Sequence, residues 1–127
     1  MSYTSDRKFR MWAYSVSHSF LLLRSTYNPD EERRGFNIDI EFVGVDYLDM
    51  PITLQGISIE ELKEGLPEKF SKYQNSVRYR VFQIKSDANY YIVAANYLVG
   101  KNSWIGEDRM INSSLKYDKI LATSDKR

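Results

Sequence analysis

The segment from Phe36 to Phe42 alternates apolar and polar side chains without a break. Its apolar positions are Phe36, Ile38, Ile40 and Phe42, and its polar positions are Asn37, Asp39 and Glu41. Successive side chains of a strand point to opposite faces. The pattern therefore predicts an antiparallel strand with one face on a core and the other face in water.

Four further runs have the aromatic and β-branched composition of strands, and they span residues 9–16, 19–25, 77–84 and 90–99. Short polar segments separate most of these runs, and the long crossover helices that parallel strands need are missing. We therefore expect a mainly β fold, either an antiparallel sandwich or a partly closed barrel, of about six to eight strands.

Two short helices are expected beside the strands. Ser58 and Glu61 have the spacing of a capping box, and Gly65 is placed to end a helix, so we predict one around residues 59–64. Pro67 is tolerated in the first turn of a helix, which favours a second one around residues 67–73.

The chain has 127 residues, the size of one ordinary domain. Leu, Ile, Val and Phe make up 33 of them, enough apolar side chains for a folded core. We expect a flexible tail over residues 1–7, a globular domain over 8–122 and a frayed end over 123–127. The polar N-terminus lacks the apolar core of a signal peptide, and no run is long enough to cross a bilayer. These features predict a cytoplasmic protein that does not bind membranes.

Several kinds of chemistry are disfavoured by composition. The chain has no cysteine and one histidine, which excludes disulfides, thiol catalysis and metal sites built from thiolates or histidine clusters. Nucleotide-binding, zinc and kinase motifs are also missing. We therefore expect no cofactor and no metal.

The charge is balanced in total but uneven along the chain. The formal net charge is +1, yet residues 30–68 hold eleven acidic and three basic residues, a local net charge of −8. A near-neutral chain lacks the basic footprint of nucleic-acid-binding proteins, so we do not expect such a partner. The uneven distribution indicates either pairing of strands within the fold or a surface that attracts a charged partner.

Two pairs of charged residues are candidate binding residues. Asp39 and Glu41 share a strand face, a spacing that suits two catalytic carboxylates and equally a solvated surface. Arg78 and Arg80 share a face in the same way. Two guanidinium groups could hold a carboxylate or phosphate, or pair with Asp39 and Glu41 across the sheet.

The remaining candidates are one histidine and several aromatic residues. His18 is the one histidine of the chain and lies between serines, which fits either a general base or a polar residue at a turn. Aromatic side chains dominate both binding surfaces and β cores. The aromatic candidates for a binding surface are Trp12, Tyr14, Tyr91 and Trp104.

These observations favour a small non-catalytic binding protein whose partner is another protein or a second copy of the chain. An immunity-type inhibitor of a toxin has this format. The acidic segment around Asp30, Glu31 and Glu32, together with Asp39 and Glu41, is the expected contact in a charged version of this interaction. The first alternative is a β-barrel that binds a small ligand in an aromatic-lined cavity. The second alternative is a hydrolase that uses Asp39, Glu41 or His18.

Overall fold

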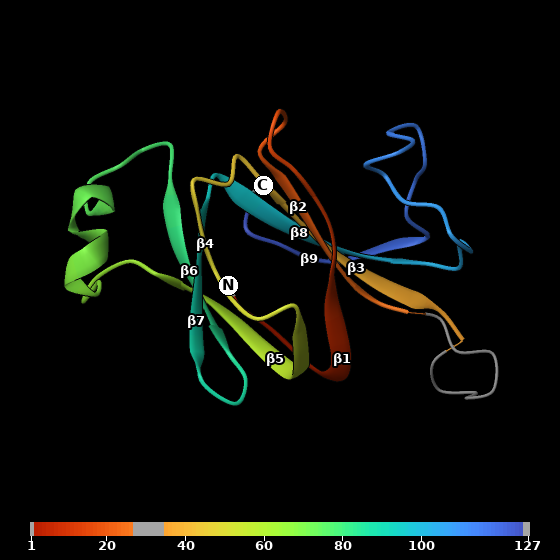
Figure 1. Ribbon diagram of the computed structural model, residues 1–127, viewed down its shortest axis with the longest axis horizontal. Coiled ribbons are helices and arrows are strands. Elements are labelled where there is room, and N and C mark those ends of the chain that lie inside the picture. Colours follow the sequence, from red (N-terminus) through yellow and green to blue (C-terminus); the bar gives the residue numbers. More distant parts are fainter. Residues whose placement is uncertain (1, 27–34, 126–127) are drawn as a thin grey trace.

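The computed structural model describes residues 2–26 and 35–125, in which nine strands form one antiparallel sheet that is not closed (Figure 1). The strands are β1 (Ser2–Ser15), β2 (Phe20–Ser25), β3 (Asn37–Val43), β4 (Tyr47–Asp49), β5 (Thr53–Leu62), β6 (Arg80–Lys85), β7 (Asn89–Ala94), β8 (Asn96–Asn102) and β9 (Lys119–Thr123). Their order in the sheet is β4-β7-β6-β5-β1-β2-β3-β8-β9. The mainly β, antiparallel fold is confirmed, with more strands than predicted.

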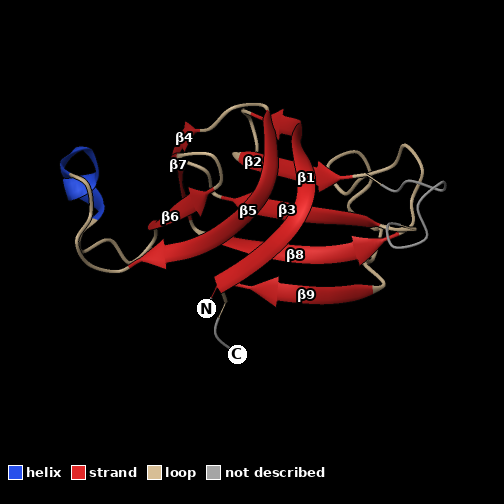
Figure 2. Ribbon diagram, turned by 90° about the horizontal axis from the view of Figure 1, so that it is seen from below, coloured by secondary structure: helices blue, strands red, loops and turns tan. Residues whose placement is uncertain are grey.

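The sheet curls until its two halves pack on each other. Residues 2–10 of β1 pair with β5, and residues 10–15 pair with β2, so this long strand belongs to both halves. Figure 2 shows β1 and β5 running across β3. Phe42 of β3 lies 5.9 Å from Phe82 of β6, measured between ring centroids, although the three strands β5, β1 and β2 lie between β6 and β3 in the sheet.

 The curl of these three strands brings the two rings together around one apolar core.

The two chain ends and the first expected helix differ from the prediction. Residues 2–7, expected as a tail, belong to β1, where Tyr3 pairs with Ile59. At the other end Ser124 is buried, and its hydroxyl accepts a hydrogen bond from the Tyr97 amide.

The helix predicted around 59–64 is wrong, because residues 53–62 form β5. Ile57 and Ile59 are both buried at a spacing of two, which suits a strand and not a helix. Pairing with β1 and β6 on both sides overrides the local capping signal of Ser58 and Glu61. Gly65 does mark a change of direction, with a positive φ of 67°.

The apolar run 90–99 forms two strands in place of one. β7 pairs with β6 and β4, whereas β8 pairs with β3 and β9, and Ala95 lies between them. The Ala95 amide donates to the Val43 carbonyl, and the neighbouring Gly44 has a φ of +65°. A Cβ at position 44 would lie 3.0 Å from Cβ of Ala95, so the chain changes direction where only glycine fits well.

The second expected helix is present as the 3-10 helix η2 (Glu68–Tyr73). Its residues Phe70 and Tyr73 form a small second core with Val81 and Val93 of the sheet. Val81 faces this core while its neighbour Phe82 faces the main core, so β6 is buried on both faces there. Figures 1 and 2 both place η2 at the opposite end of the molecule from the segment that joins β8 to β9.

Candidate functional site

The polar face of β3 is buried, which corrects the prediction of a solvated face. Residues 37–42 are all buried, and Asp39 is 0% exposed. Residues 103–118, the covering segment, contribute side chains and carbonyl groups to this face. The solvated interpretation of Asp39 and Glu41 is therefore wrong.

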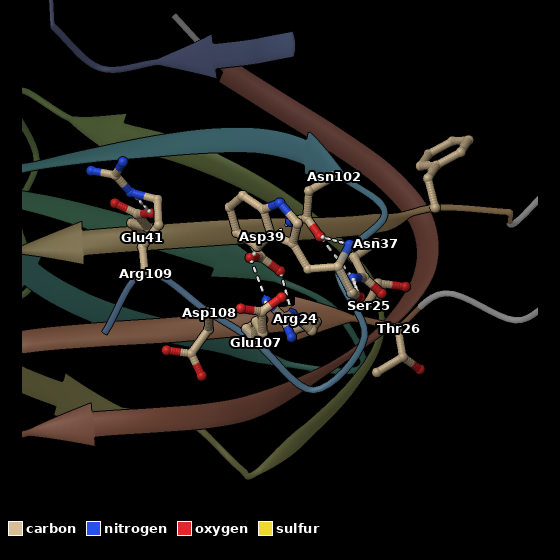
Figure 3. A network of polar contacts seen from close by, with 12 residues as sticks. Arg24, Ser25, Thr26, Asn37, Asp39, Glu41, Asn102, Glu107, Asp108 and Arg109 are labelled. Atoms are coloured by element: carbon tan, nitrogen blue, oxygen red, sulfur yellow. Dashed lines mark hydrogen bonds and ion pairs between the residues drawn. The ribbon is translucent and has the colours of Figure 1, made fainter. Parts of the chain in front are cut away.

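Asp39 is paired with Arg24, its direct neighbour across the β2–β3 ladder. Arg24 Nε and Nη2 donate to the two carboxylate oxygens over 2.6 and 2.8 Å, and both side chains are almost fully buried. Nη2 also donates to the Glu107 carbonyl over 2.8 Å, so the pair holds the covering segment (Figure 3). A buried ion pair with this geometry is costly to break, because either partner alone would be an uncompensated charge.

Two asparagines continue the network along the sheet. Asn37 and Asn102 are paired across β3 and β8, and the Asn37 amide donates to the Asn102 side-chain oxygen over 2.8 Å. Asn37 also donates to the Trp104 carbonyl, and the Asn102 amide donates to Asp39 over 3.1 Å. Figure 3 shows these asparagines on one side of Asp39, with Glu41 on the other.

Glu41 is held by two residues of the covering segment. The Tyr117 hydroxyl donates to Glu41 Oε2, and Arg109 Nε lies 2.9 Å from the same oxygen. The contact with Arg109 is an ion pair, and Nε forms no hydrogen bond within the described residues. Burial and then the neighbouring Glu41 carboxylate raise the pKa of Tyr117, so its hydroxyl stays protonated and donates.

A first cleft of about 280 Å³, the Trp cleft, lies beside this network. Its lining residues are Trp12, Arg24, Thr26, Asn37, Trp104, Ile105 and Gly106. The Arg24 guanidinium lies 5.0 Å from the centre of the Trp12 ring, and Trp104 stacks on Tyr117 at 5.1 Å. Both tryptophans of the chain therefore line one cleft, and each is held by a neighbour.

A second cleft of about 340 Å³, the His18 cleft, lies at the β1–β2 hairpin. Its lining residues are His18, Phe20, Arg109, Met110, Ile111 and Ser113. His18 is exposed, and Nδ1 lies 3.1 Å from the hydroxyls of Ser15 and Ser17. The described contacts of His18 include no carboxylate that would orient it as a general base.

The structure does not bring all predicted site residues together. Trp12 and Trp104 meet at the Trp cleft, but Tyr14 is paired with Leu21 of the main core. A register shift between Met11 and Ala13 separates Trp12 from the alternation of the strand, so Trp12 and Tyr14 do not share a face. Tyr91 packs on Phe70 of η2, at the far end of the molecule.

Arg78 and Arg80 do not pair with the carboxylates of β3, which was one of the arrangements considered from the sequence. In the described residues, Arg78 lies over the Tyr79 ring, and Arg80 lies 4.0 Å from Glu61 and donates to the Ser124 carbonyl. The acidic residues 30–32 lie outside the described residues.

Sequence reasoning missed the residues that hold the network, namely Arg24, Asn37, Asn102, Arg109 and Tyr117. One signal was present: Arg24 follows the apolar run from Phe20 to Leu23, where a charge needs a buried partner. Asp39, the partner of Arg24, is 15 residues away, whereas the Glu107 carbonyl and Asn102 are 83 and 63 residues away from the side chains that they contact.

No family model, curated protein or solved structure matches this chain. Within residues 2–26 and 35–125, no helix has the length and apolar character to cross a membrane. In the same part of the chain, no group of three or more His, Asp or Glu side chains is arranged to hold a metal ion.

Proposed function

We propose that this chain is a non-catalytic cytoplasmic binding protein that recognises a protein partner with the covering segment and its two clefts. The observation that carries the proposal is the exposure of Ile105 and Ile111, which are 84% and 79% exposed. Both lie on a segment that buried polar contacts fix to the sheet. Binding residues are often found on loops that a rigid scaffold holds in this way.

A single exposed aliphatic side chain is ordinary. Here, however, each isoleucine lines a cleft next to further apolar side chains. Ile105 lies in the Trp cleft with Trp12 and Trp104, and Ile111 lies in the His18 cleft. Apolar side chains gathered around concave surfaces are typical of interaction sites.

The hydrolase alternative has less support. Asp39 and Glu41 are occupied by arginine side chains, and neither of them lines the Trp cleft or the His18 cleft. His18 lies at an exposed turn. A catalytic site needs these groups to converge on one accessible position.

The small-ligand alternative needs a cavity inside a barrel. The sheet is open, and the space between its halves is filled by apolar side chains such as Phe42, Phe82 and Tyr97. The structure therefore favours a ligand on the surface over a ligand in the interior.

The role that the sequence suggested for Asp39 and Glu41 in a charged contact with the partner changes as well. Asp39 and Glu41 are buried and paired, so they are unsuited to contact a partner. An inhibitor of the immunity type remains the most specific form of the proposal, with the apolar clefts and not these two carboxylates as its contact.

The test is affinity capture from a lysate of the source organism, followed by mass spectrometry and measurement of affinity with the purified partner. The binding variant carries Ile105→Asp and Ile111→Asp. The matched control carries Ile52→Asp and Val77→Asp, because these aliphatic residues are 73% and 101% exposed elsewhere on the molecule. We expect the partner to bind the wild-type chain and the control, and to bind the binding variant at least about tenfold more weakly. Equal loss of affinity in both variants would contradict the proposed surface.

A further inference from the structure

We propose that the Trp cleft binds a proline-rich segment of the protein partner in an extended conformation. This inference rests on the proposed function, because it names the chemistry of the partner at one of the two clefts.

The cleft offers hydrogen-bond donors that have no partner among the described residues. Arg24 uses Nε and Nη2 in the contacts described above, which leaves Nη1. The indole N–H groups of Trp12 and Trp104 likewise have no acceptor among the hydrogen bonds of the described residues. Donors placed at a concave surface favour a ligand with acceptor atoms.

Three acceptors next to these donors are already in use. The Trp104 carbonyl accepts from Asn37, the Glu107 carbonyl accepts from Arg24, and the Asn102 side-chain oxygen accepts from Asn37 and from the Trp104 amide. These acceptors are less open to a ligand that brings its own N–H groups, which would lose part of their hydration on binding. Proline has a carbonyl group and no N–H group, so its hydrogen bonding matches the cleft.

The charge of the cleft favours a neutral ligand. Arg24 is compensated by Asp39 at 2.6 and 2.8 Å, so its remaining N–H group belongs to a neutral pair. A free anion gains less from such a pair than from an unpaired arginine, whereas a neutral carbonyl group costs much less to desolvate than a free anion.

The walls and the volume of the cleft fit a short peptide. Two indole rings and Ile105 give flat apolar surfaces against which pyrrolidine rings pack, as in other aromatic grooves that bind polyproline helices. The volume of about 280 Å³ lies at the lower end for sites that enclose a small molecule. It suits one or two side chains of a segment that continues over the surface.

The test uses an octaproline peptide with an acetylated N-terminus and an amidated C-terminus. The two tryptophans give two indole N–H signals in a ¹H–¹⁵N correlation spectrum, and both belong to residues of the cleft. We expect octaproline to shift both signals in a saturable way. A glycine–serine octamer with the same end groups is the control peptide and should not shift them.

Two substitutions separate the donors from the apolar walls. Trp12→Phe and Trp104→Phe each keep an aromatic wall and remove one N–H group. We expect at least one of them to weaken octaproline binding about fivefold, the loss expected for one neutral hydrogen bond. Tyr14→Phe is the control variant, because Tyr14 lies outside the cleft and should leave binding unchanged.

The inference is overturned if octaproline shifts neither indole signal, if the control peptide shifts both equally, or if both Phe variants bind octaproline as the wild type does. Competition distinguishes this failure from failure of the proposed function. A partner whose binding depends on Ile105 and Ile111 but is not displaced by octaproline would leave the proposed function standing and overturn the proline site. Octaproline binding without any partner that depends on these isoleucines would do the reverse.

Discussion

The ring of Tyr117 lies directly on the backbone of Gly100, so that a Cβ atom at position 100 would approach Tyr117 Cγ to 2.3 Å. Gly100 is opposite Asp39 in the β3–β8 ladder. The missing side chain therefore makes room, on the polar face of the sheet, for the residue that donates to Glu41. Glycine is needed at position 100 for its small size and not for its backbone freedom, because Gly100 does not have a positive φ.

We expect Gly100→Ala to lower the free energy of unfolding by about 1–3 kcal/mol, the usual cost of inserting a group into a packed site. Urea unfolding followed by circular dichroism measures this change. In a Tyr117→Ala background the same substitution should cost much less, because the ring that it meets is gone. An equal cost in both backgrounds would show that Tyr117 is not the obstacle.

The Arg24–Asp39 pair should behave as a unit. Arg24→Met leaves a buried carboxylate and Asp39→Leu leaves a buried guanidinium, so each should destabilise the fold by about 3–5 kcal/mol. The double variant removes both charges and should cost clearly less than the two single changes together. Unfolding free energies of the four proteins complete the cycle.

The exposed pair of Lys69 and Asp49 is the matched control for this cycle. Its atoms lie 3.3 Å apart, but the two side chains are 47% and 44% exposed. Removing either partner should cost far less than removing Arg24 or Asp39, because water screens an exposed pair. If both pairs showed the same coupling, burial would not be the reason for the strength of the first.

Much of the sheet was readable from the sequence, since strands depend on local alternation. Phe36–Phe42 alternates strictly, and β3 covers residues 37–43. The second face of β3 was not readable, because alternation shows only that two faces differ. Whether the polar face meets water or a covering segment depends on residues that follow β8 in the chain, such as Arg109 and Tyr117.

The false helix around 59–64 and the missed network have a common physical origin. Ser58 and Glu61 satisfy a local rule, but β1 and β6 pair with β5 from both sides and decide its conformation. Likewise Arg24 is recognisable as a charge that needs a partner, whereas Asp39 as that partner follows only from the register of β2 and β3. Long-range pairing is thus the information that local patterns lack.

The ion pair between Arg109 and Glu41 should hold the covering segment on the sheet. Arg109→Met leaves Glu41 buried with the Tyr117 hydroxyl alone, so we expect the segment to open more often. Amide exchange of Met110 and Ile111, whose N–H groups donate to Asp108, should become about tenfold faster.

Adding Glu41→Gln to this variant removes the unpaired charge and should restore part of the protection. Arg78→Met is the control, since Arg78 is exposed and stacks on Tyr79 away from the network. Unchanged exchange in Arg109→Met would mean that the remaining contacts, such as Arg24 with the Glu107 carbonyl, hold the segment without this pair.

The buried hydroxyl of Tyr73 should make stability fall at high pH. It donates to Asp46 over 2.5 Å, and burial together with this carboxylate raises the pKa of Tyr73 to about 12. Tyrosine in the unfolded chain has a pKa near 10, so the folded chain binds this proton more firmly. The resulting stabilisation is complete below about pH 10 and is lost as the pH rises towards 12.

Tyr73→Phe lacks the group, so the difference in unfolding free energy between wild type and variant should shrink by about 2 kcal/mol from pH 9 to pH 11.5. Tyr117 is present in both proteins, and its contribution cancels in this difference. Urea unfolding at a series of pH values measures it, and a difference that stays constant across the range would contradict the raised pKa of Tyr73.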